Sequence, residues 1–78
     1  MKPGDLVRLV DGDWAGVVVY QEPPEQAWRA NFYHVPTGMV ALIVHAGTKN
    51  RNRRGCLEVM VLLAGRLGWI STENLELC

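Results

Sequence analysis

The sequence predicts a small all-β barrel that forms one domain from residues 1–78. Three observations favour this fold class. Short runs rich in β-branched residues recur along the chain, apolar and other residues alternate within them, and helical periodicity is absent. The last third of the chain is the most informative, because it reads as a hairpin, a tryptophan strand, a short polar turn and a short final strand, the order in which a small closed barrel ends.

The predicted barrel has five to six strands. Asp11-Gly12 is a turn signal between the first two. Gly65 adopts a positive φ more easily than Ala64, so we expect a type I turn closed by a glycine bulge between the fourth and fifth predicted strands. Residues 71–74 are short and polar and favour one turn of 3₁₀ helix before the final short strand. The five longer strands are expected at Leu6–Val10, Ala15–Tyr20, Gly38–His45, Cys56–Leu63 and Leu67–Ser71.

Two long connections interrupt this pattern. Residues 21–35 contain Pro23-Pro24, which removes two amide donors and rules out a central strand. Residues 46–55 are rich in Gly, Lys, Asn and Arg. We therefore expect two loops on a compact scaffold, where binding residues are most often placed.

The alternation within the strands leaves apolar residues on both faces of the sheet. The set expected to fill the barrel interior is Val7, Leu9, Val17, Val19, Val40, Leu42, Val44, Val59, Val61, Leu63, Leu67 and Trp69. The opposite face keeps Leu6, Val18, Met39, Ile43, Met60 and Leu62. A solvated face of an antiparallel sheet is normally polar, so this second set suggests a face that another protein covers. A shift of one residue in any strand would exchange the two sets.

Length and composition point the same way. A chain of 78 residues buries only about 60% of its unfolded surface, so its core is marginal. Yet 49% of the residues are hydrophobic and 21% are charged. One small core cannot hide so much apolar surface, and the simplest cover is another copy of the chain.

Charge and targeting signals exclude several function classes. Eight basic residues balance eight acidic ones, so no overall field attracts nucleic acid or membranes. The first residues lead directly into a strand pattern without a signal-peptide core, and the longest apolar run, residues 39–44, is too short to span a bilayer. We expect a protein that is not secreted through a signal peptide. Cys56 and Cys78 do not make a disulfide framework and are expected as free thiols, although a bridge between them is geometrically feasible.

Two segments carry a resemblance to a known fold group. The opening Lys2-Pro-Gly-Asp-Leu-Val-Arg-Leu9 and the closing Gly65-Arg-Leu-Gly-Trp-Ile-Ser-Thr-Glu-Asn-Leu-Glu76 resemble Src-homology-3-like small barrels. More narrowly, Val44-His-Ala-Gly-Thr-Lys49, Glu58-Val-Met-Val61 and Trp69 near a Leu-Glu-Leu ending resemble small barrel proteins of tailed phages, notably those that infect cyanobacteria. The resemblance implies a virion or host-cytoplasm location. The first strand lacks the aromatic residues of peptide-binding signalling domains, which argues against polyproline binding.

Half of the basic residues lie in one loop. Lys49, Arg51, Arg53 and Arg54 form a cluster that suits nucleic-acid phosphates or an acidic partner, or is simply a solvated hairpin tip. No aromatic residue lies in this loop to stack on a base, which counts against binding of single strands.

Aromatic residues supply further candidates. Trp69 occupies a strand position and is expected in the core. Trp28 lies in the first long loop beside Arg29, and Trp and Arg are frequent anchors of protein interfaces. The alternative is that this loop folds back over an open end of the barrel.

Metal, cofactor and catalytic signatures are missing from the sequence. Asp11-Gly12-Asp13 resembles the start of a calcium loop but lacks its later ligands. His34, His45, Cys56 and Cys78 have no zinc-ligand spacing. No phosphate-binding glycine loop or nucleophile motif is present, and a barrel this small has little room for a substrate pocket. We expect no enzyme, no cofactor and no small-molecule substrate.

The sequence therefore predicts a non-catalytic phage structural or assembly protein that binds itself or a larger virion protein. Its expected interface residues are Met39, Ile43, Met60, Leu62, Trp28 and Arg29. One alternative is a nucleic-acid-binding accessory module that uses the basic loop at residues 49–54, although nucleic acid is not the favoured partner. The other is a small regulator of one host protein.

Overall fold

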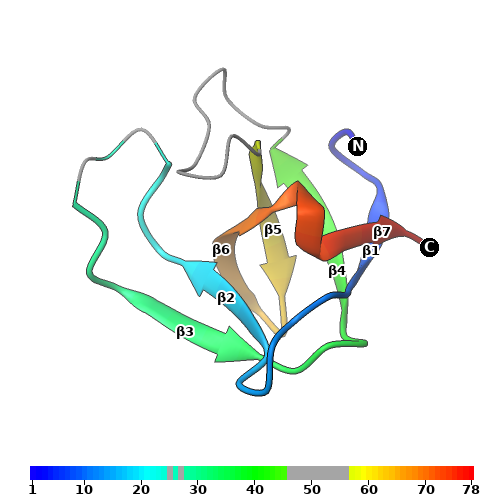
Figure 1. Ribbon diagram of the computed structural model, residues 1–78. Coiled ribbons are helices and arrows are strands. Elements are labelled where there is room, and N and C mark those ends of the chain that lie inside the picture. Colours follow the sequence, from blue (N-terminus) through cyan, green and yellow to red (C-terminus); the bar gives the residue numbers. More distant parts are fainter. Residues whose placement is uncertain (25, 27, 46–56) are drawn as a thin grey trace.

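The computed structural model describes residues 1–24, 26, 28–45 and 57–78 of the chain. It is an all-β structure with a short 3₁₀ helix near its C-terminus (Figure 1). The strands are β1 (Leu6–Leu9), β2 (Val17–Tyr20), β3 (Phe32–Val35), β4 (Val40–His45), β5 (Glu58–Leu63), β6 (Arg66–Ser71) and β7 (Leu75–Leu77). The 3₁₀ helix η1 (Thr72–Asn74) lies between β6 and β7 and confirms the predicted polar turn.

All strands belong to one antiparallel sheet with the order β3-β2-β6-β5-β4-β1-β7. The chain ends lie on the same side of the molecule, because β7 pairs with β1 (Figure 1). The prediction of a closed barrel is wrong: the seven-stranded sheet is open, and β3 and β7 form its edges. The predicted number of five to six strands is also too low, because the sequence pattern predicts a loop where β3 lies.

Strand β3 shows why the loop prediction for residues 21–35 failed. Pro23-Pro24 excludes a strand only where the prolines stand, and the chain returns to β2 several residues later. The strand is an edge strand, which agrees with the expectation that this segment holds no central strand. Phe32 and Tyr33 suit a strand by their own propensity, and that local signal could have been used.

The turn between β5 and β6 also differs from the prediction. Leu63 pairs with Arg66, so Ala64 and Gly65 form a two-residue connection. Both residues have positive φ, 51° for Ala64 and 79° for Gly65, where the predicted type I turn has negative values at both central positions. Positive φ at both positions is the signature of a type I′ turn, whose twist matches that of the flanking strands. The strand twist therefore forces Ala64 into a conformation that alanine disfavours.

The inner face of the sheet forms one aliphatic core. Its residues are Val7, Leu9, Val17, Val19, Val35, Ala41, Ile43, Val59, Val61, Leu63, Ile70 and Leu75, with Tyr33 packed against them. The predicted inward facing of β1, β2 and β5 is confirmed. Gly68 faces this core, since it pairs with Val61, and a Cβ there would overlap Val19 Cγ1.

The predicted facing of β4 and β6 is wrong. Ala41 and Ile43 are buried, whereas the predicted inward residues Val40 and Val44 are exposed and Leu42 is only half-buried. The pairing of Val7 with Ala41 sets this choice, which sequence alternation alone left open. A β-bulge between Ile43 and His45 then moves His45 to the outer face opposite Met60.

In β6 the same one-residue error exchanges the two faces. Ile70 pairs with Val59 and lies in the core, whereas Leu67 is 57% exposed. Trp69 is buried as expected, but it pairs with Met60 and therefore lies on the outer face, apart from the aliphatic core.

Candidate interaction surface

The outer face of the sheet carries a continuous row of leucines across four strands. Leu6 of β1 pairs with Leu42 of β4, Leu42 with Leu62 of β5, and Leu62 with Leu67 of β6. Residues paired across neighbouring strands point to the same face, so the four side chains form one line. Leu6, Leu62 and Leu67 are 53%, 39% and 57% exposed. We call these four residues the leucine row.

A second row crosses the same face beside the first. His45 pairs with Met60, Met60 with Trp69, Trp69 with Tyr20 of β2, and Tyr20 with Phe32 of β3. The rings of His45 and Trp69 meet edge to face, with centroids 6.1 Å apart. We call these five residues the aromatic row. Trp69 is only 6% exposed, so this part of the face has a cover that the leucine row lacks.

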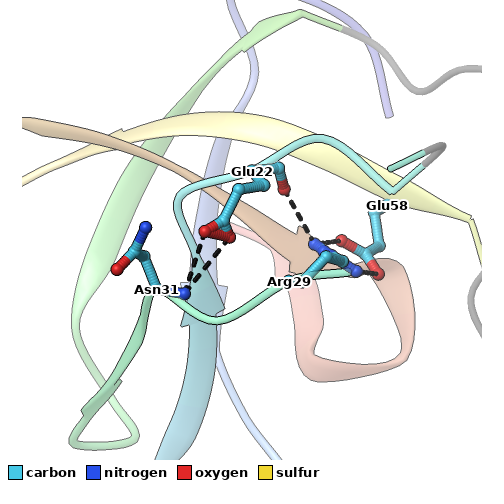
Figure 2. A network of polar contacts seen from close by, with 4 residues as sticks. All are labelled: Glu22, Arg29, Asn31 and Glu58. Atoms are coloured by element: carbon cyan, nitrogen blue, oxygen red, sulfur yellow. Dashed lines mark hydrogen bonds and ion pairs between the residues drawn. The ribbon is translucent and has the colours of Figure 1, made fainter. Parts of the chain in front are cut away.

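Over Tyr20, part of that cover comes from residues 21–24 and 28–31, which a buried ion pair holds in place. Figure 2 shows the Arg29 guanidinium facing the Glu58 carboxylate. Nη1 of Arg29 donates to Oε2 of Glu58 at 2.8 Å, and Nη2 donates to Oε1 at 2.6 Å. Only 13% of the Arg29 side chain and 2% of the Glu58 side chain are exposed. This forked geometry matches a guanidinium to a carboxylate and fixes the segment against β5.

Further contacts stiffen the segment on both sides of the ion pair. Arg29 Nη2 also donates to the carbonyl oxygen of Glu22 at 3.1 Å, and the Glu22 carboxylate accepts a bond from the Asn31 backbone N–H at 2.9 Å (Figure 2). The guanidinium carbon of Arg29 lies 3.7 Å from the centre of the Tyr20 ring, a cation–π contact. Arg29 therefore covers Tyr20 and pairs Glu58 at the same time. We call the described residues of this segment, 21–24, 26 and 28–31, the Arg29 strap.

The strap changes the interpretation of Trp28 and Arg29. The two alternatives were an anchor for a partner and a loop that folds back over the barrel, and the segment does fold back, through Arg29. Arg29 is therefore bound within its own chain, and only 13% of its side chain is exposed to a partner. Trp28 itself is 80% exposed, so it stays a candidate anchor.

The other predicted interface residues fall into two groups. Met60 and Leu62 lie on the outer face as expected, half-buried and exposed respectively, and Met39 is 37% exposed just before β4. Ile43 is completely buried in the core, so its predicted place on the outer face is wrong. Pairing with Val61 turns it inward, because the register of β4 is offset by one residue from the prediction.

Sequence reasoning missed several residues of this surface. The alternation predicts Leu42 and Leu67 in the interior and predicts no role for Glu58. The Glu58 carboxylate is the only buried charged group among the described residues. The alternation within β5 could have placed Glu58 on this surface, because Glu58 precedes the inward-facing Val59 and shares its face with Met60 and Leu62.

The basic cluster and half of the proposed thiol pair lie outside the described residues. Those are Lys49, Arg51, Arg53, Arg54 and Cys56. Cys78 is an exposed free cysteine. His34 lies on exposed β3 and His45 on the aromatic row, and among the described residues no group of three or more metal-ligating side chains comes together.

One more aromatic side chain is presented to solvent. Trp14 is 98% exposed at the tip of a tight turn, in which the backbones of Asp13 and Gly16 exchange hydrogen bonds of 3.2 and 2.9 Å. The chain does turn between β1 and β2, but the hydrogen-bonded turn lies at Trp14-Ala15, after the predicted Asp11-Gly12 signal, and β1 and β2 pair with other strands rather than with each other. A shallow hollow lined by Trp14, Pro36 and Thr37 lies beside this tip.

No protein family model, no curated protein and no solved structure matches this chain. In the described residues, no helix has the length and apolarity needed to cross a membrane. The exposed apolar rows of the sheet are the features of this chain that bear on its function.

Proposed function

We propose that this chain is a non-catalytic interaction module, a structural or assembly component whose leucine row is covered by another protein surface. The simplest partner is a second copy of the chain, and a larger protein is the other. The observation that carries the proposal is the line of four leucines across β1, β4, β5 and β6, next to a part of the same face that the Arg29 strap covers.

Physical chemistry supports a partner on this face. Apolar side chains that are scattered singly on a surface need no explanation, but a contiguous apolar patch is unfavourable in water and usually marks an interface. Val40 extends the patch, because it is 49% exposed and lies on the same face as Leu42. Covering such a surface gains roughly 25 cal/mol per Å² of apolar area removed from water.

The wider context of the proposal comes from the resemblance to Src-homology-3-like barrels of tailed phages. The adjacent first and last strands and the 3₁₀ turn before β7 support a likeness to that group, although the strands form an open sheet and not a closed barrel. On this proposal the chain is a virion or capsid-associated component that works in the virion or the host cytoplasm. The leucine row then serves as the docking face of an assembly.

The test compares molecular mass before and after the leucine row is made charged. The measurement is size exclusion with light scattering on purified, nuclease-treated protein. We expect the Leu62→Lys, Leu67→Lys double variant to have a lower mass than the wild type and to stay folded. Leu77→Lys is the matched control, because Leu77 is 59% exposed on β7 and lies outside the row.

Either of two results would count against the proposal as stated. An unchanged mass in the double variant, with assembly intact, would remove the leucine row from the contact between copies. A monomeric wild type would exclude self-association through this face and leave a larger protein as its partner. Removal of bound nucleic acid beforehand keeps the basic residues 49–54 from influencing the mass.

A further inference from the structure

The edge strand β3 offers backbone hydrogen-bonding groups to solvent. It is the last strand on one side of the open sheet, and β2 is its only neighbour in the strand order (Figure 1). Just beyond the β2–β3 ladder, the Gln21 N–H donates to the Asn31 carbonyl at 2.9 Å, which indicates that this pair continues the ladder as a hydrogen-bonded pair. Hydrogen-bonded and non-bonded pairs alternate in an antiparallel ladder. Tyr33 and Val35 therefore bond to β2, whereas the N–H and C=O groups of Phe32 and His34 point away from it.

This edge lacks the features that normally prevent pairing between sheets. Protected edges carry charges, prolines or bulges, or are very short. The opposite edge strand β7 has three residues, and its central Glu76 forms an ion pair with Arg8. Strand β3 reads Phe-Tyr-His-Val, without a proline or a carboxylate, lysine or arginine side chain, and its register with β2 is regular. The two edges of one sheet therefore differ in how open they are to another strand.

We propose that β3 pairs antiparallel with β3 of a second copy, around a two-fold axis at Tyr33. This arrangement places Phe32 of each copy opposite His34 of the other. Both residues point their backbone groups outward, so the two pairs make about four hydrogen bonds. An axis at His34 would instead place Phe32 opposite Pro36, which has no N–H to donate. The edge is thus complementary to itself in the register centred on Tyr33.

The side chains fit the same register. Phe32 and His34 lie on the outer face, where their rings already meet edge to face at 5.9 Å within one chain. Pairing around Tyr33 brings each Phe32 ring next to the imidazole of the other copy, a favourable cross-strand neighbour. The contact also joins the aromatic rows of two copies into one surface, because Phe32 ends that row. A two-fold contact of this kind closes on itself and gives a dimer.

This contact goes beyond the proposed function, because it uses backbone groups of β3 and none of the leucine row. The Leu62→Lys, Leu67→Lys variant is therefore the right background for its test. We expect that variant to remain a dimer at high concentration. Its Phe32 and His34 amides should gain protection from hydrogen exchange as the concentration rises, while Tyr33 and Val35 are protected throughout. Equal exchange of Phe32 and His34 at all concentrations would overturn the proposal.

A proline at position 34 removes only an outward donor. His34→Pro is expected to weaken self-association about tenfold or more, because each copy loses one hydrogen bond across the contact. The pairing with β2 is retained, since it does not use the His34 N–H. His34→Thr is the matched control, because it keeps the N–H and a strand-forming side chain. Equal weakening by the two substitutions would assign the effect to the imidazole and contradict backbone pairing.

A mixing experiment tests the register itself without a proline. Phe32→Lys alone and His34→Glu alone are each expected to lower the dimer fraction. An equimolar mixture should form a heterodimer by native mass spectrometry, because the new lysine of one copy lies opposite the new glutamate of the other. Failure to form a heterodimer would exclude the axis at Tyr33. Growth into open-ended polymers would overturn the two-fold arrangement in favour of pairing between β3 and β7.

Discussion

The two halves of the outer face differ in how far their apolar side chains are removed from water. Around the aromatic row, the Arg29 strap folds back and covers the sheet, and Trp69 is 6% exposed. Around the leucine row, no segment among the described residues does the same, and Leu67, two residues earlier in the same strand, is 57% exposed. The comparison shows that the fold can bury a second apolar surface when a long connection is available to cover it.

The difference also shows what the cover requires. The strap is held by a charged pair rather than by apolar packing: Arg29 satisfies the Glu58 carboxylate, and its guanidinium lies over Tyr20. A buried carboxylate on a sheet face would be costly without such a partner. Glu58 and Arg29 therefore depend on each other, whereas the leucines depend on a surface outside the chain.

The largest expected loss of stability follows from removing Arg29, which holds the strap over the aromatic row. Arg29→Met leaves the Glu58 carboxylate buried without its partner, so we expect the free energy of unfolding to fall by about 3–5 kcal/mol, which for a domain of this size can abolish folding. Urea denaturation followed by tryptophan fluorescence measures the change. Arg8→Met is the control, because the Arg8–Glu76 pair is about half exposed on both sides and should contribute at most about 1 kcal/mol.

The double variant Arg29→Met, Glu58→Leu separates charge from packing. Replacing both partners by apolar residues of similar size removes the unpaired charge, so most of the lost stability should return. If Arg29→Met costs no more than Arg8→Met, the ion pair does not hold the strap. If the double variant is as unstable as Arg29→Met, the loss comes from packing over Tyr20.

A somewhat smaller effect is expected at Gly68, on the inner face directly behind these rows. Gly68→Ala places a methyl group against Val19 Cγ1 in a core without space for it. Overpacking of this kind costs roughly 1–3 kcal/mol. Thermal unfolding measures the loss, and in the Val19→Ala background the same substitution should cost less, since the conflicting methyl is gone. Equal costs in the two backgrounds would place the conflict elsewhere.

The turn next to the leucine row offers a stabilising substitution. Ala64 has a φ of 51°, which costs an L-residue other than Asn or Gly about 1 kcal/mol. Ala64→Asn creates the Asn-Gly pair that type I′ turns favour, and we expect a gain of up to about 1 kcal/mol in urea unfolding. Gly65→Ala should have the opposite sign, because φ is 79° there. A loss of stability in Ala64→Asn would contradict the type I′ geometry.

The smallest effect is expected for single changes in the leucine row. Leu67→Thr should change the stability of the isolated chain by no more than about 0.5 kcal/mol, because the side chain is mostly in water already. The measurement uses protein dilute enough to be monomeric, since self-association adds apparent stability. Trp69→Thr, on the covered half of the same strand, should be far more costly. Similar losses in both variants would mean that the two halves are equally buried.

Parts of this architecture follow directly from local sequence. The all-β class, the polar 3₁₀ turn at Thr72–Asn74 and the inward facing of β1, β2 and β5 agree with the alternation of apolar residues and with turn chemistry. The surplus of apolar residues also predicted a second apolar face. These features depend on neighbours in the chain, so the sequence contains the information for them.

Other features depend on contacts between distant segments. In β4 both alternating sets are mainly apolar, so the pattern does not distinguish Ala41 and Ile43 from Val40 and Leu42, and the pairing with β1 makes the choice. In β6 the more apolar set, Leu67 and Trp69, lies on the outer face, because Gly68 and Ile70 pair with the inward-facing Val61 and Val59. The β-bulge between Ile43 and His45 also shifts the pairing register of β4 against β5, and no residue in this segment predicts that shift.

Alone, the sequence determined that this protein is a small β structure with more apolar surface than one core can bury, because composition and periodicity are properties of the chain itself. The tertiary structure decided where that surplus lies. Register sets the four leucines in one line, the strap pairs Arg29 with Glu58 across 29 positions of sequence, and the open sheet leaves β3 as an edge. Such features arise only when strands far apart in the chain are placed side by side.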